Sequence, residues 1–244
     1  MCSLYAYTTI VIYQNCDYTM PVGTITSLHA QINDSQRISV FIDGVFALGI
    51  SLTTLTREGL YVGKVLSEAD YQRLEQTETT EKSLYVALRL LSARPRSTAE
   101  IRERLQRKGF TATSIEQTVE RLRELDLLDD TAFARLWIEN RQTHRPRGVN
   151  ALRDELRRKG VHRDIVEATL QDDQLIGDET EQAITLARSI VHKYSDSPNR
   201  TTFARRMGGY LQRRGFNFDI VHSVIDQLWQ EIQHQQEHTQ DNDM

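Results

Sequence analysis

The sequence predicts a mainly α-helical protein made of three tandem three-helix repeats, forming an elongated, curved array after a small antiparallel β-sheet. One short glycine-containing motif occurs three times, and strand-like alternation ends before its first copy. Only 4 Pro and 12 Gly occur in 244 residues, which favours long regular elements. The apolar content of 39% is low for one thick core and suits small units in a row.

The first 19 residues differ from the rest. They contain both cysteines and no Lys or Arg, so they lack the basic region of a secretory signal. A strand pattern begins directly after Met20. We therefore expect Met20 to be the true start and residues 1–19 to be a mis-assigned leader. Two cysteines exclude a disulfide scaffold and predict a reducing, cytoplasmic location.

Residues 20–80 predict a small N-terminal extension with a β-hairpin. Asp43-Gly44 suits a type I′ hairpin turn, in which both positions need positive φ. Short strands are expected over residues 23–28, 37–42 and 45–48.

Two helical pieces follow this hairpin. The first is expected near residues 51–57. The second begins at Ser67, which forms a capping-box pattern with Asp70. The polar segment 77–81 is expected to be a linker to the repeats.

The repeated motif combines leucine, basic residues, glycine and an apolar residue. Alignment of its copies on glycine places apolar residues eight and four positions before it, and six and ten positions after it. Both pairs have i, i+4 spacing, so each marks one face of a helix. The glycine is expected to end the first of these helices in the left-handed conformation. The three copies cover residues 105–110, 156–161 and 211–216, with glycines at 109, 160 and 215.

Residues four positions after each glycine are good helix N-caps, namely Thr113, Asp164 and Asp219. Glu116 and Glu167 stand at the reciprocal capping-box position. A further helix precedes each pair, over residues 82–93, 130–143 and 178–194. The expected repeats are residues 81–128, 129–173 and 177–232, followed by a disordered polar tail over 233–244.

The third repeat contains Gly208-Gly209 inside its helix. Two glycines there cost on the order of 2 kcal/mol relative to alanine. Close packing and local flexibility both remain open as explanations.

The net charge of −4 hides an uneven distribution. Residues 82–172 carry 19 basic and 14 acidic residues, whereas both flanking segments are acidic. This asymmetry predicts an anionic partner for the middle of the chain. Arginine suits planar contacts to phosphate or carboxylate. The candidate binding residues are Arg94, Arg96, Arg102, Arg104, Arg107, Lys108, Arg141, Arg145, Arg147, Arg153, Arg157, Arg158, Lys159 and Arg163.

A second interpretation of these arginines is a solvated helix face with intrahelical pairs such as Glu103–Arg107. Aromatic residues such as Trp137 are assigned to core packing by their helical spacing. Catalytic motifs for nucleotide binding, metalloprotease and serine hydrolase chemistry are absent from the sequence. We therefore predict no enzyme activity, no catalytic residues, no metal and no cofactor. No apolar run reaches the roughly 18 residues needed to span a bilayer.

Three segments resemble the signatures of the RecX family of bacterial recombination regulators. The first is RPRSTAEI at 94–101 with LQRKGF at 105–110, and the second is LDLLDDTAFA at 125–134. The third is RQTHRPRG at 141–148 with LRDELRRKGV at 152–161. The resemblance covers residues 84–172 well and 178–231 more loosely. It implies tandem three-helix repeats and a cytoplasmic, non-enzymatic regulator of DNA repair, recombination and the SOS response.

The resemblance further implies binding to the RecA filament on single-stranded DNA, where such proteins lie in the groove and restrain extension, ATP hydrolysis and strand exchange. We expect a monomer that clamps the filament with its arginine-rich helix ends, against RecA carboxylates, DNA phosphates or both. A sequence-specific helix-turn-helix DNA binder is the alternative. A helical-repeat scaffold that binds only protein is the third possibility.

Overall fold

The computed structural model describes residues 22–242 except 33, 196 and 198. The chain divides into two compact units at Lys82 and Ser83. The expected leader, residues 1–19, lies outside the described residues, so the role of Met20 as the start stays a prediction.

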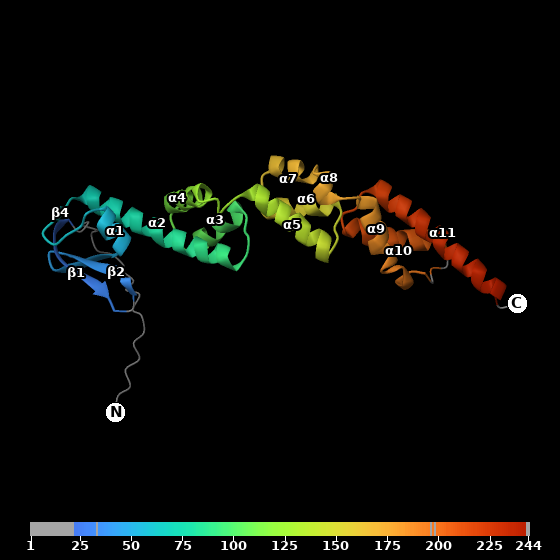
Figure 1. Cartoon of the computed structure of the whole chain (residues 1–244), viewed down its shortest axis with the longest axis horizontal. Helices are drawn as coiled ribbons and strands as arrows, with labels where there is room; N and C mark the ends of the chain where they lie inside the picture. The colour runs from blue at the N-terminus through green and yellow to red at the C-terminus, as the bar shows by residue number, and fades with distance from the viewer. Residues whose placement is uncertain (1–21, 33, 196, 198, 243–244) are drawn as a thin grey trace, which may run out of the picture. The chain divides into compact units, whose positions relative to one another are not determined.

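The N-terminal unit contains a four-stranded antiparallel sheet with the strand order β3-β2-β1-β4 (Figure 1). Asp43 and Gly44 have φ values of 46° and 81°, which confirms the positive-φ hairpin turn. The sheet packs on one core that includes Ile25, Val40 and Ile50. The strands are β1 (Gly23–Gln31), β2 (Asp34–Ile42), β3 (Val45–Ser51) and the unforeseen β4 (Val65–Leu66).

Two helices accompany the sheet: α1 (Leu52–Arg57) and α2 (Glu68–Ala93). The capping box that opens α2 is confirmed, since the Ser67 amide donates to Asp70 Oδ2 at 3.1 Å and the Asp70 amide donates to Ser67 Oγ at 3.2 Å. The expected linker at 77–81 is instead part of α2. Its Glu78 is buried and pairs with Arg37 at 2.7 Å, so tertiary contacts stabilise a helix through this polar segment.

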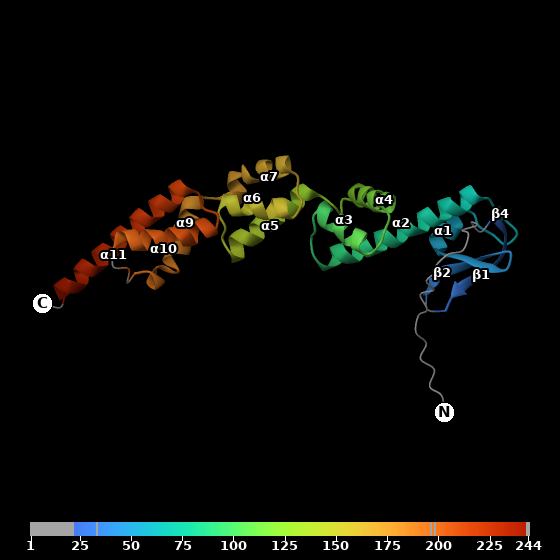
Figure 2. The same ribbon diagram turned by 180° about the vertical axis from the view of Figure 1, so that it is seen from behind.

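The second unit contains three successive helical repeats, which confirms the tandem architecture (Figures 1 and 2). The first repeat uses the end of α2 with two further helices, and the next two repeats each begin a new helix. The helices are α3 (Thr98–Arg107) and α4 (Ala112–Glu124); α5 (Asp130–His144), α6 (Val149–Arg158), α7 (Arg163–Leu170) and the short α8 (Asp173–Ile176); then α9 (Glu179–Arg188), the 3₁₀ helix η1 (Val191–Lys193), α10 (Arg200–Arg213) and α11 (Phe218–Asn242).

The three repeat glycines end helices in the left-handed conformation, as expected, with φ values of 84°, 74° and 92° at Gly109, Gly160 and Gly215. Each repeat also has its own small core. The apolar positions predicted around each glycine are buried in it, for example Leu105, Leu156 and Leu211.

The predicted caps of the following helices are wrong by two residues. Thr111 and His162 are the N-caps of α4 and α7, in place of Thr113 and Asp164. In the third repeat Asn217, and not Asp219, accepts a hydrogen bond from the Ile220 amide at 2.9 Å. After the glycine, a single apolar residue is enough to turn the chain, so the next helix begins earlier.

The third repeat differs from the expected boundaries at two places. Its first helix, expected over residues 178–194, ends at Arg188 and is followed by η1. The helix α11 continues through Asn242, across the segment assigned to a disordered tail. The Gln and Glu residues of this segment have high helix propensity, and the helix that they extend is anchored by the buried Leu228 and Ile232.

Candidate anion-binding groove at a repeat junction

At both repeat junctions, a helix N-cap residue donates a hydrogen bond to a carbonyl of the next repeat. Ser97 is the N-cap of α3, and its Oγ donates to the carbonyl of Lys159 at 2.5 Å. Gly148 is the N-cap of α6, and its amide donates to the carbonyl of Arg214 at 3.0 Å. Ser97 and Gly148 precede their repeat glycines by the same number of residues, as do Lys159 and Arg214. Successive repeats therefore dock in the same register.

A carboxylate from the next repeat completes each junction. The amide of Thr98, the first residue of α3, donates to Asp130 Oδ1 at 2.8 Å. The amide of Val149, the first residue of α6, donates to Glu179 Oε1 at 2.9 Å. Both acids begin the first helix of the next repeat, so each satisfies an otherwise unpaired amide at a helix N-terminus.

Two repeat glycines also permit close approach at the junctions. A Cβ atom at Gly160 would lie 2.3 Å from the Cβ of Ala99, and one at Gly215 would lie 2.3 Å from the Cβ of Ala151. A Cβ atom at Gly109 would meet nothing within 4 Å. Gly109 therefore serves only the backbone turn, whereas the other two glycines serve both the turn and the docking.

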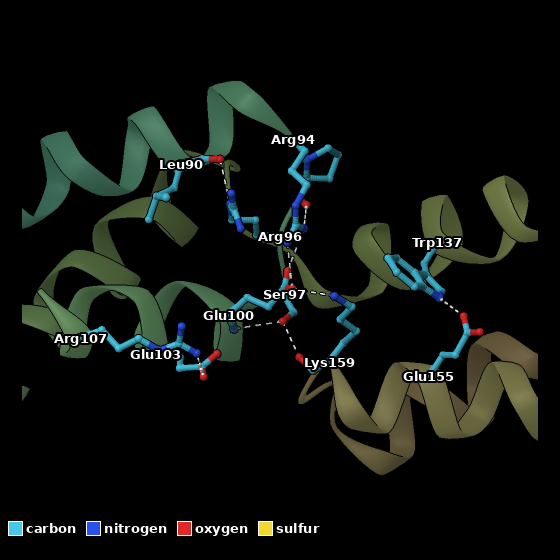
Figure 3. Close-up of polar contacts among 11 residues, drawn as sticks. Leu90, Arg94, Arg96, Ser97, Glu100, Glu103, Arg107, Trp137, Glu155 and Lys159 are labelled. Atoms are coloured by element: carbon cyan, nitrogen blue, oxygen red, sulfur yellow. Dashed lines mark hydrogen bonds and ion pairs between the residues drawn. The ribbon is translucent and has the colours of Figure 1, made fainter.

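Several of the predicted binding residues form ion pairs with carboxylates of this protein. At the first junction Glu100 accepts from both terminal nitrogens of Arg94 at 3.0 Å and from Lys159 Nζ at 2.8 Å (Figure 3). Burial opposes ionisation of Glu100, but these hydrogen bonds and charges prevail and lower its pKa to about 2. Arg96 lies nearby, and its Nε donates to the Leu90 carbonyl at 2.9 Å.

A second ion pair repeats within units. Arg102 Nε donates to Glu116 at 2.8 Å in the first repeat, and Arg153 Nε donates to the equivalent Glu167 at 3.0 Å in the second. Arg157 joins Glu167 at 3.0 Å. The expected capping role of the two glutamates is therefore wrong, because each pairs with arginine. Hydrogen bonds from Arg102 and Arg153 lower the pKa of Glu116 and Glu167, respectively.

The remaining candidates differ in whether they have a partner within the protein. Arg107 pairs with Glu103, as the solvated-face interpretation predicts. Four of the fourteen candidates make no side-chain hydrogen bond or ion pair with any described residue: Arg104, Lys108, Arg145 and Arg163. The fourteen candidates therefore do not form one continuous cluster.

Four of the predicted residues meet in an open cavity of about 680 Å³ beside the second junction, which we call the basic groove. Its cations come from α5, the α5–α6 connection, the end of α6 and the end of α10. They outnumber the two carboxylates of the groove, Asp154 and Glu155. The groove cations are Arg141, Arg147, Arg158, Lys159 and Arg213.

Trp137 organises one wall of the basic groove. The Arg141 guanidinium lies 4.5 Å from the centre of its ring, and Lys159 Nζ lies 4.9 Å from the same ring. The indole nitrogen donates to Glu155 at 2.9 Å, and Arg141 Nε donates to the same carboxylate at 2.7 Å (Figure 3 shows Trp137 and Glu155). Trp137 contacts the repeat core as predicted, and its ring also positions groove cations.

Arg158 and Arg213 are the groove cations that pair with no carboxylate among the described residues. They hold the same position in consecutive repeats, two residues before Gly160 and Gly215. The predicted site does not include Arg213, because its residues were taken from the net-basic segment 82–172. The alignment of the three repeats places Arg213 at the position of Arg158 and could have identified it.

An excess of positive charge in an open cavity suits a phosphate or carboxylate ligand. Groups of three or more possible metal ligands are missing from the part of the chain that the structure describes. Within residues 22–242, apart from the three gaps, no helix has the length and apolarity of a membrane span.

Comparisons with known proteins cover both units. Family models match in chain order: the N-terminal domain of regulatory protein RecX over residues 23–67, then the first, second and third RecX three-helix domains over residues 85–122, 129–170 and 177–225. These matches confirm the family resemblance of the three signatures.

Curated relatives and solved structures agree with the family models. Regulatory protein RecX of Lactobacillus johnsonii is 31% identical over 211 residues, which is 86% of this chain and 75% of the relative. That of Bacillus pumilus is 29% identical, over 84% of this chain and 77% of the relative. The crystal structure of RecX from Lactobacillus salivarius is 25% identical in sequence and has a TM-score of 0.55. The match covers 62% of this chain and 97% of that structure. Another RecX crystal structure shares the fold at 22% sequence identity, with a TM-score of 0.68. The match covers 83% of this chain and 98% of that structure.

Proposed function

Because the chain belongs to the RecX family of regulatory proteins, we propose that it binds the RecA filament on single-stranded DNA and restrains filament extension, ATP hydrolysis and strand exchange. The observation that carries this proposal is the basic groove. It is lined by Arg158 and Arg213, two arginines that pair with no carboxylate of the described residues and are therefore available to an anionic surface.

The docking of the repeats supports a clamp. Hydrogen bonds between equivalent positions join the first repeat to the second and the second to the third. Positions equivalent in sequence are therefore presented at regular intervals along the repeats. A filament also presents its subunits at regular intervals, so it is a partner that several repeats can contact together.

Only some of the groove and junction cations are suited to a test. Arg157 pairs with Glu167, and Lys159 pairs with Glu100, so reversing either charge would disturb the fold. Arg158 and Arg213 have no carboxylate partner in the part of the chain that the structure describes. The informative variant is therefore Arg158→Glu with Arg213→Glu. Its matched control is Arg89→Glu with Lys193→Glu, an equal change of charge at exposed residues outside the groove.

The decisive measurement is RecA ATPase activity and strand exchange on single-stranded DNA with each variant titrated in. We expect the wild type and the control to inhibit at similar concentrations. We expect the groove variant to need at least tenfold more protein, with its thermal unfolding unchanged. No effect of the wild type on RecA would refute the proposed function, and equal inhibition by the groove variant would refute the role of the groove. Specific duplex binding without RecA would favour the helix-turn-helix alternative.

A further inference from the structure

The third repeat lacks the ion pair that the first two repeats share. In those repeats an arginine seven residues before the glycine pairs with a glutamate seven residues after it, as in Arg153–Glu167. The third repeat has Gly208 and His222 at these positions. His222 instead faces Asp226 of the same helix, with Nδ1 at 3.1 Å from Oδ2.

The missing pair leaves a cavity of about 330 Å³ between α10 and α11, which we call the apolar pocket. Gly208, which stands at the sequence position of the paired arginine in the other repeats, lines it together with Val221 and Ile225. Phe218 lies at the same cavity with 68% of its surface exposed, so it adds an accessible apolar side chain to the pocket.

The backbone of α10 does not require this glycine pair. Neither Gly208 nor Gly209 has a positive φ. A Cβ atom at Gly208 would lie 3.3 Å from Ile225 Cδ1 and 3.6 Å from Val221 Cγ1, so it would require Ile225 to shift by a few tenths of an ångström. Glycine in a helix interior is unfavourable, and this one tight contact explains only Gly208 of the pair.

The apolar pocket lies next to the basic groove along α10. Gln212 lines both cavities, and Arg213 of the groove is the next residue along α10. Arg205 also lines the pocket and has no ion-pair partner among the described residues. An apolar depression flanked by unpaired cations is complementary to a large apolar side chain with carboxylates beside it.

We propose that the apolar pocket binds a protein segment in which a large apolar side chain is flanked by acidic residues, with the carboxylates in the basic groove. This inference rests on the proposed function, since it places such a segment on RecA. A nucleic-acid backbone alone would not fill the pocket. Its phosphates would bind the cations and would leave the apolar walls exposed to water.

The test rebuilds the ion pair of the other repeats in the third repeat. Gly208→Arg with His222→Glu is expected to fill the pocket. Phe218→Ser removes an exposed side chain and leaves the core in place. The matched control is Leu136→Ser, which removes a 50% exposed apolar side chain from α5. Each protein is titrated against RecA filaments on single-stranded DNA, and separately against the same DNA without RecA.

We expect both pocket variants to bind filaments at least tenfold more weakly, with binding to DNA alone unchanged and the control equal to the wild type. If the wild type does not bind filaments, the proposed function itself fails. If the wild type binds and Phe218→Ser binds equally well, the pocket inference is overturned even if the double variant does not fold. Equal losses on filaments and on bare DNA would assign the pocket to nucleic acid and also overturn it.

Discussion

At the scale of single residues, the arginines of this protein have two separate roles. Arg94, Arg102, Arg141 and Arg153 pair with internal carboxylates and hold helices together. Arg158 and Arg213 pair with no carboxylate within the described ranges and line an open groove. The residue type alone does not distinguish the paired arginines from the unpaired ones. The difference depends on carboxylates that lie 6 or 14 residues away in the sequence, beyond the i, i+4 spacing of one helix face.

Glu100 predicts a pH dependence of stability. Its pKa falls from an ordinary value of 4.5 to about 2 in the folded protein. A lowered folded-state pKa gives stability that is complete above pH 4.5 and is lost as the pH falls towards 2. Urea unfolding at several pH values across this window should therefore show a steeper loss for the wild type than for Glu100→Gln. Parallel profiles would contradict the role of this carboxylate.

The repeat glycines predict graded effects of alanine. Gly109→Ala should cost about 1–2 kcal/mol, because only the left-handed backbone opposes it. Gly160→Ala has the same backbone strain and also a clash with Ala99, and such overpacking adds roughly 1–3 kcal/mol. Denaturant unfolding of the two variants measures the difference. Equal destabilisation would show that the junction relaxes around the extra methyl group.

At the scale of elements, helix termini carry the architecture. The apolar spacing around each glycine was enough to predict the helix that ends there and the helix that follows. The exact caps were missed, because Thr111 and Thr113 are equally good cap residues in sequence and only the tightness of the turn selects Thr111. The continuous α2 was missed for a different reason. Its polar middle is stabilised by contacts between Glu78 and the sheet.

Ser97 should matter more than an ordinary cap. Thr111→Ala removes an exposed cap and should cost about 1 kcal/mol. Ser97→Ala removes a buried cap and also leaves the Lys159 carbonyl without its donor, which adds about 1–3 kcal/mol for an unsatisfied buried group. Thermal unfolding of both variants checks the order. A smaller loss for Ser97→Ala would argue against the shared docking register.

At the scale of the whole molecule, charge is segregated along the chain. The net charge of −4 conceals a middle segment with 19 basic and 14 acidic residues. Much of this basic charge is compensated internally, so the surplus is concentrated at a few places such as the basic groove. A protein of this kind should avoid non-specific binding to bare DNA and still bind an ordered anionic surface.

Filament binding should therefore weaken as salt increases, since the surplus charges are exposed to solvent. Arg158→Gln with Arg213→Gln should make the dependence of log Kd on log salt concentration shallower than in the wild type. Binding measured from 50 to 200 mM NaCl tests this expectation. The same slope for both proteins would show that the groove contributes no electrostatic contact.

The sequence by itself determined the repeat architecture, the glycine turns and the hairpin, because these depend on residue types at short, regular spacings. Only the tertiary structure decided which cations are available and where a cavity opens. The basic groove needs α6 and α10 side by side, and the apolar pocket needs Gly208 beside Val221 and Ile225. Ion pairing and cavity formation depend on distances between residues remote in the chain, and such distances exist only after the repeats have packed.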